Sequence, residues 1–117
     1  MARPEQIKDE FLTLIDRHLD DLVHLRVTEM MEIKDFAETL HIHPTHLSNT
    51  IKELCGTSPC GLYQPKILRV AQELLADTNF SIHETALRLS FEPSQFTKWF
   101  KQLTGITPKA YRTQILK

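Results

Sequence analysis

Three histidines, His41, His43 and His46, lie close together in the sequence and raise the question of a metal site. Zinc ligands can share one face of a helix, and the spacing of His43 and His46 would allow this. No cysteine or carboxylate follows at a ligand spacing, so we interpret the three as polar residues of a turn and a helix start. We therefore predict no bound metal.

The two cysteines, Cys55 and Cys60, have no second cysteine pair to accompany them, which makes a zinc site improbable. A reactive Cys55 would need an adjacent cation to favour the thiolate, and its nearest candidate is Lys52, one helical turn away. A repair-type alkyl acceptor would need a Pro-Cys-His-Arg stretch, which the sequence lacks. We expect free thiols. Because no set of residues forms a catalytic group, we predict that the chain is not an enzyme and uses no cofactor.

The most informative chemistry lies in an internal repeat, which appears when the sequence is shifted against itself by 49 residues. Residues 33–59 then align with residues 82–108 without a gap. The identical pairs are Ile33/Ile82, Ala37/Ala86, Leu40/Leu89, Pro44/Pro93, Lys52/Lys101, Leu54/Leu103, Gly56/Gly105 and Pro59/Pro108. Each copy predicts a short helix, a turn and a second helix that opens at a proline, which is the helix-turn-helix plan.

The second helix of each copy has an apolar face and a polar face. We predict that the apolar residues turn toward the core: Leu47, Ile51, Leu54, Phe96, Phe100 and Leu103. The residues of the polar faces carry hydrogen-bonding or cationic groups and no carboxylate: Thr45, His46, Ser48, Asn49, Lys52, Ser94, Gln95, Thr97, Lys98 and Lys101.

These polar faces suit double-stranded DNA. Asn and Gln can pair with adenine edges, Lys with guanine, and Ser or Thr with several bases or with phosphate. An acidic side chain there would face the phosphates unfavourably. The simpler alternative is a duplicated helical hairpin whose polar faces are only solvated.

The sequence predicts that the elements which position these residues are all helices. Apolar residues recur at three- and four-residue steps from Pro4 to Leu22, which indicates one amphipathic helix. Residues 24–32 suggest a connection with some helical character. We expect Ser58, Ser81 and Thr107 to cap helices, with Glu84 reaching back to Ser81, and we see no convincing strand. A proline at position 65 predicts a kink or break near residues 61–64.

Composition places the chain among globular proteins, with 41% hydrophobic and 25% charged residues in 117. The net charge is −1, which is not basic for a DNA-binding protein, but its distribution is uneven. Residues 1–39 carry a net −5 and residues 40–117 a net +4. The sequence has no membrane-spanning stretch and no apolar signal region, so we expect a cytoplasmic location.

The second copy contains Phe-Glu-Pro-Ser-Gln-Phe-Thr-Lys-Trp-Phe-Lys-Gln-Leu-Thr-Gly-Ile-Thr-Pro at residues 91–108. It closely resembles the signature of the AraC/XylS family of bacterial transcription regulators. The first copy and its Gly-Thr-Ser-Pro exit at residues 56–59 match the same family. The resemblance covers about residues 5–115, nearly the whole chain.

The resemblance implies an all-α C-terminal DNA-binding domain of about seven helices, with homeodomain-like three-helix units. It implies one domain over residues 1–117, built from a lobe at about 5–57, a linker helix at about 59–76 and a lobe at about 78–117. The helix-turn-helix units would occupy residues 33–54 and 82–103.

The same resemblance assigns functional roles. The recognition helices, at about 44–54 and 93–103, would enter successive major grooves of double-stranded DNA. The base-reading positions of the family fall on Thr45, Ser48, Asn49, Ser94, Thr97 and Lys98. We assign His46, Lys52, Gln95 and Lys101 to the DNA backbone. The family also favours activation, with RNA polymerase and an N-terminal regulatory domain as candidate protein partners.

The sequence departs from the family pattern at several positions. Ser90 stands where glycine is usual, Ile67 stands where the linker helix commonly has arginine, and Pro65 and Trp99 are unusual. The first recognition helix has no Lys or Arg at a base-reading position. We therefore expect the second lobe to dominate electrostatic attraction and the first to tune specificity or contact a protein.

A second function remains open. The acidic first third would suit a helical protein-interaction module that has weak or lost DNA binding. The two functions differ in salt dependence, because phosphate contacts release counterions and weaken steeply as salt rises.

Overall fold

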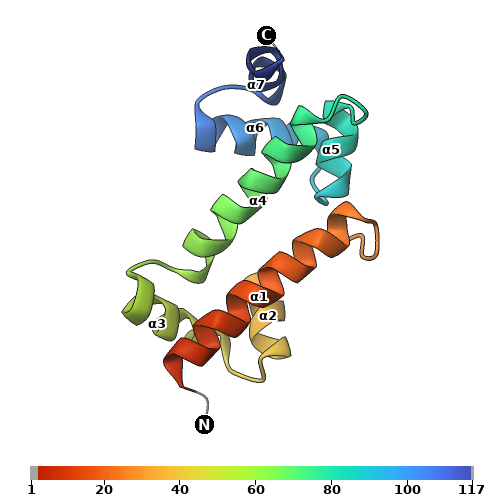
Figure 1. The fold of residues 1–117 in the computed structure, drawn as a ribbon. Helices are drawn as coiled ribbons and strands as arrows, with labels where there is room; N and C mark the ends of the chain where they lie inside the picture. The colour runs from red at the N-terminus through yellow and green to blue at the C-terminus, as the bar shows by residue number, and fades with distance from the viewer. Residues whose placement is uncertain (1–2, 117) are drawn as a thin grey trace.

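The computed structural model describes residues 3–116, which form seven helices and no strand (Figure 1). The helices are α1 (Pro4–Val23), α2 (Ile33–Thr39), α3 (Pro44–Cys55), α4 (Pro59–Ala76), α5 (Ile82–Arg88), α6 (Pro93–Thr104) and α7 (Pro108–Ile115). The all-α, seven-helix prediction is confirmed. Among the described residues, no helix combines the length and apolar character needed to cross a membrane.

The internal repeat is reproduced in the structure. Both bounds of α2 and α3 recur 49 residues later in α5 and α6, and α4 and α7 begin at equivalent prolines. The backbone repeats as well, because Gly56 and Gly105 end their helices with φ values of 72° and 85°. Such left-handed helix ends favour glycine, which has no Cβ to clash.

The predicted caps form at three helix starts. The hydroxyls of Ser58, Ser81 and Thr107 accept hydrogen bonds from the backbone N–H groups of Gly61, Glu84 and Ala110, at 3.1, 2.9 and 3.1 Å. Each bond satisfies one of the donors that a helix start leaves unpaired.

Two apolar cores underlie two lobes. The first gathers residues of α1, α2 and α3 around Phe36, whose ring meets those of Phe11 and Tyr63 edge-on. The second gathers residues of α5 and α6, including Phe96 and Phe100. The helix α4 runs from one lobe to the other and contributes to both cores (Figure 1).

The sequence predicted a kink or a break in α4, and the break is wrong, because the helix is continuous from Pro59 to Ala76. Pro65 lies on the exposed side, while Tyr63 and Ile67 on the opposite side are buried in the first core. A proline removes one hydrogen bond and crowds the carbonyl four residues earlier, here that of Gly61. The packing of two buried side chains beside Pro65 outweighs that local cost.

Residues 24–32 form the expected connection, in which helical hydrogen bonding is confined to the turn at His24 and Leu25 that follows α1. Two buried side chains hold it. The Met31 N–H donates to His18 Nε2 at 2.8 Å, and the Tyr63 hydroxyl donates to the Met31 carbonyl at 2.9 Å. Met31 is therefore tied to α1 and α4 at once.

This tie predicts a pH dependence of stability. Burial lowers the pKa of His18 below its ordinary 6.5, against the opposing effect of Asp21 and Asp35. Only a neutral ring can accept the Met31 hydrogen bond at Nε2. The folded protein therefore resists protonation more than the unfolded chain does. The stability contributed by the neutral His18 ring is fully present above the histidine pKa of the unfolded chain, about 6.5. It is lost as the pH falls through 6.5 toward the lower pKa of His18 in the folded protein.

We expect urea denaturation to show a smaller pH-dependent loss of stability for His18→Gln than for the unaltered chain, when near-neutral and mildly acidic buffers are compared. Glutamine can still accept from Met31 but does not titrate. His83→Gln, which changes an exposed histidine, serves as the control. Equal pH dependence of the His18 variant and the unaltered chain would contradict this role for His18.

Candidate nucleic-acid interface

The helices α3 and α6, which the sequence predicts to be the recognition helices, each have one buried face. Leu47, Thr50 and Ile51 are buried on α3, and Phe96 and Phe100 on α6. The inward placement predicted for Leu54 and Leu103 is wrong, since these side chains are 38% and 45% exposed. Both lie in the last turn of their helix, beyond the end of the apolar core that the preceding turns pack against.

The predicted DNA-contacting residues all lie on α3 or α6, away from the buried face. Eight are exposed, and Ser48 and Thr97 are half-buried. The ten are Thr45, His46, Ser48, Asn49, Lys52, Ser94, Gln95, Thr97, Lys98 and Lys101. Each helix thus presents one polar face with both amide and cationic groups, as the sequence pattern indicated.

The turn before each recognition helix has the same geometry in both lobes. The Ile42 N–H donates to Ala37 O at 3.0 Å, and the Phe91 N–H donates to Ala86 O at 2.9 Å. His41 and Ser90, the equivalent turn residues, have positive φ values of 59° and 66°. The residue that replaces the family's usual glycine therefore adopts the backbone that glycine would favour.

The residues that open the recognition helices differ between the lobes. In the first, His43 Nδ1 accepts the Thr45 N–H at 3.1 Å. In the second, Glu92 makes no such cap, and its Oε1 accepts the Ser94 hydroxyl at 2.7 Å. The sequence predicted that a helix starts at Glu92 and Pro93, but Glu92 was not counted among the site residues.

The cations of the recognition helices are distinguished by their lack of partners. Among the described residues, no carboxylate pairs with Lys52, Lys98 or Lys101. Their charges are therefore available to an external anion.

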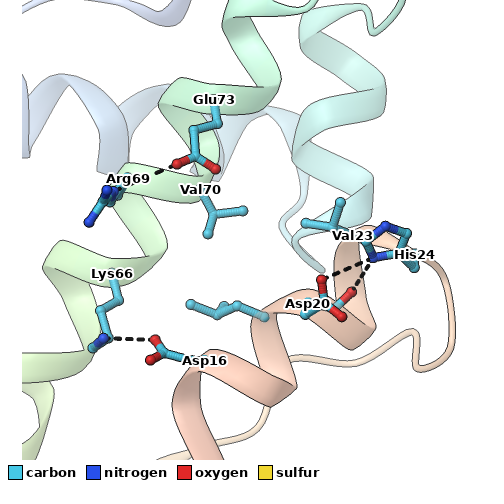
Figure 2. Close-up of a pocket in the computed structure, with 9 residues that line it drawn as sticks. Asp16, Asp20, Val23, His24, Lys66, Arg69, Val70 and Glu73 are labelled. Atoms are coloured by element: carbon cyan, nitrogen blue, oxygen red, sulfur yellow. Dashed lines mark hydrogen bonds and ion pairs between the residues drawn. The ribbon is translucent and has the colours of Figure 1, made fainter. Parts of the chain in front are cut away.

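The cations of α4 are already engaged. Figure 2 shows the groove between α1 and α4, where Lys66 pairs with Asp16 at 2.7 Å and Arg69 lies 3.6 Å from Glu73. Ile67, at the position where the family commonly has arginine, is buried in the first core. The linker helix therefore offers less free positive charge than its sequence suggests.

Contacts between the lobes limit how the two recognition helices can move apart. The Trp99 indole N–H on α6 donates to Gln64 Oε1 on α4 at 2.5 Å. The same indole packs on Phe91 and Phe96, with ring centroids 4.9 and 5.9 Å apart. The Arg88 guanidinium on α5 donates to the Val23 carbonyl at the end of α1, also at 2.5 Å. Trp99 thus packs within the second lobe, and it also joins α6 to the linker.

Comparison with known proteins places this geometry in a family. A helix-turn-helix domain family matches residues 36–114, which include all of the second helix-turn-helix unit and all but the first three residues of the first. The chain belongs to the AraC-type helix-turn-helix family. It is accordingly a DNA-binding regulator domain of that type.

Individual proteins of similar sequence or structure support this family assignment. Over 94 residues, 80% of the chain, it is 32% identical to the uncharacterized HTH-type transcriptional regulator YobQ of Bacillus subtilis, of which it spans 39%. Among solved structures, the C-terminal domain of AraT, a response regulator from Geobacillus stearothermophilus, aligns with a TM-score of 0.80 at 28% identity. That alignment covers 97% of this chain and 88% of the AraT domain. The DNA-binding domain of AdpA, solved in complex with a target DNA, has the same fold, with a TM-score of 0.66 at 23% identity. That alignment covers 83% of this chain and 91% of the AdpA chain.

The strained turn of this AraC-type domain yields a prediction. A left-handed backbone costs a non-glycine residue about 1 kcal/mol or more, and glycine avoids this cost. Part of the resulting gain in stability is lost, because glycine gives the unfolded chain more conformational freedom. We expect Ser90→Gly to raise the free energy of unfolding by up to about 1 kcal/mol in chemical denaturation. Ser90→Ala keeps the strain and is the matched control. A glycine variant no more stable than the alanine variant would contradict the argument.

Proposed function

We propose that the chain binds double-stranded DNA in a sequence-specific manner, with α3 and α6 in successive major grooves. The observation that carries this proposal is the pair of equivalent helices α3 and α6, each with a polar, carboxylate-poor face. Lys52 on α3 and Lys98 and Lys101 on α6 have no carboxylate partner among the described residues. Unpaired ammonium groups favour phosphate, and exposed amide and hydroxyl groups can pair with base edges.

The dimensions of the molecule support binding across two grooves. The structure is 50 Å along its longest axis, which exceeds the groove repeat of about 34 Å. The bond between Trp99 and Gln64 and the continuous α4 resist changes in the separation of α3 and α6. A rigid spacing would let one binding event order both contacts, which lowers the entropic cost of the second.

We assign base reading to Thr45, Ser48, Asn49, Ser94, Thr97 and Lys98, and backbone contacts to His46, Lys52, Gln95 and Lys101. Thr97 has its hydroxyl proton engaged with the Pro93 carbonyl at 3.2 Å, so it would meet DNA mainly as an acceptor or through its methyl group. Lys98 is the cation best placed for guanine, since lysine pairs with guanine O6 and N7.

The effect on transcription is part of the same proposal. We propose activation, through contact between the acidic α1 side of the first lobe and RNA polymerase. We further propose that an N-terminal regulatory domain cooperates with this one. The chain spans only 39% of YobQ, so such a relative contains considerably more protein than this domain.

The decisive experiment is selection of binding sites from random duplex DNA, followed by fluorescence anisotropy on the selected site at increasing salt. A sequence-specific binder yields one enriched motif and loses affinity steeply as salt rises. A protein-interaction module yields no enriched motif and shows weak or absent binding. That result would overturn the proposal.

Two lysine variants test the assignment of roles. Lys98→Ala should weaken binding to the selected site by about 1–3 kcal/mol and relax preference at one base pair. Lys101→Ala should weaken all sequences alike and reduce the salt slope by about one. Lys8→Ala removes a cation from the acidic helix α1 and should leave sequence preference unchanged. Identical profiles for the Lys98 and Lys101 variants would refute the division.

A further inference from the structure

The feature that the general DNA-binding proposal leaves unexplained is a carboxylate at the head of the second recognition helix. Glu92 is exposed, has no cationic partner among the described residues and does not cap α6. A free negative charge there opposes the phosphates of bound DNA. The positive end of the α6 dipole favours a carboxylate at this position, so the charge alone does not indicate a role toward DNA.

The hydrogen bond from Ser94 is the feature from which a role toward DNA can be argued. The Ser94 hydroxyl donates to Glu92 Oε1 at 2.7 Å, so its only proton is already used. The pair then faces outward with acceptors alone, namely the remaining lone pairs of the carboxylate and of the Ser94 oxygen. Any base edge within reach of Ser94 is also close to the carboxylate.

An acceptor-only pair discriminates sharply among base edges in the major groove. Guanine presents two acceptors, and thymine presents an acceptor and a methyl group, so neither can donate to it. Adenine presents an amino donor beside the N7 acceptor, which the carboxylate repels. Cytosine presents an amino donor alone, and carboxylates accept hydrogen bonds from cytosine N4.

The first lobe shows that this arrangement is a property of Glu92 and not of the fold. At the equivalent residue, His43, the Nδ1 atom accepts a hydrogen bond from the Thr45 N–H. A neutral ring in that state carries its proton on Nε2 and so offers a donor. The two recognition helices thus open with hydrogen-bonding groups of opposite polarity.

We infer that Glu92, acting with Ser94, selects a cytosine in the second half of the DNA site. This inference rests on the proposed sequence-specific binding and names one of its specificity determinants. The carboxylate lowers affinity for sequences without that cytosine, because only its N4 amino group compensates the repulsion between the carboxylate and the DNA.

The test compares selected sites for the unaltered chain and for Glu92→Gln, whose amide can still accept from Ser94 but adds a donor. The unaltered chain should lose on the order of tenfold in affinity when the cytosine is replaced. For Glu92→Gln that penalty should largely disappear, and other bases should be accepted at the same position. Ser94→Ala removes the hydrogen bond that orients the Glu92 carboxylate, so this variant should show a weaker preference for cytosine.

Glu84→Gln is the matched control, since it removes an exposed carboxylate from the same lobe on α5. Both glutamine variants should bind non-cognate DNA more tightly, but only Glu92→Gln should change the selected motif. Thermal unfolding of both variants checks that the fold is retained, which we expect because Glu92 makes no cap.

Three outcomes are informative. Loss of preference at a cytosine in Glu92→Gln alone supports the inference. An unchanged motif, relaxation at a base other than cytosine, or the same relaxation in Glu84→Gln overturns it. If the unaltered chain enriches no motif at all, the proposed sequence-specific function itself fails, and the inference fails with it.

Discussion

The structure depends on one constraint, which is that α4 must satisfy two apolar cores at once. Tyr63 and Ile67 are buried in the first core, and Ala71, Leu74 and Leu75 in the second. A continuous helix between them sets the relation of α3 to α6 before any DNA is present. This explains why Pro65 is tolerated inside the helix: burying a large apolar side chain contributes roughly 1.5–3 kcal/mol, and two such residues flank the proline.

The duplicated unit preserves its scaffold and varies its outer face. Helix bounds and left-handed turn positions recur at the same spacing. The scaffold can carry strain of about 1 kcal/mol at Ser90, because the residues on either side of it are held by the fully buried Leu89 and by the packing of Phe91. The outer faces, by contrast, differ in charge and in hydrogen-bond polarity, so the two helices present different chemistry to a ligand.

Much of this could be read from the sequence, because repeated apolar spacing and capping residues are local signals. Both helix-turn-helix units, the caps at Ser58, Ser81 and Thr107 and the polar faces were predicted correctly. The errors fell where neighbouring elements decide. The predicted inward packing of Leu103 failed because the core ends before the last turn of α6, and periodicity alone carries no information on where a partner helix stops.

The sequence by itself therefore determined the duplicated all-α plan, its helix starts and stops, and which side chains belong to each recognition helix. The tertiary structure alone decided which of these groups are free. Lys66 forms an ion pair with Asp16, which lies far from it in the sequence. Lys98 has no such partner among the described residues. Glu92 likewise is only a helix-start residue in the sequence, and the structure makes it the partner of Ser94. Hydrogen bonds and ion pairs depend on positions within a few tenths of an ångström, and those positions are set only when the helices pack.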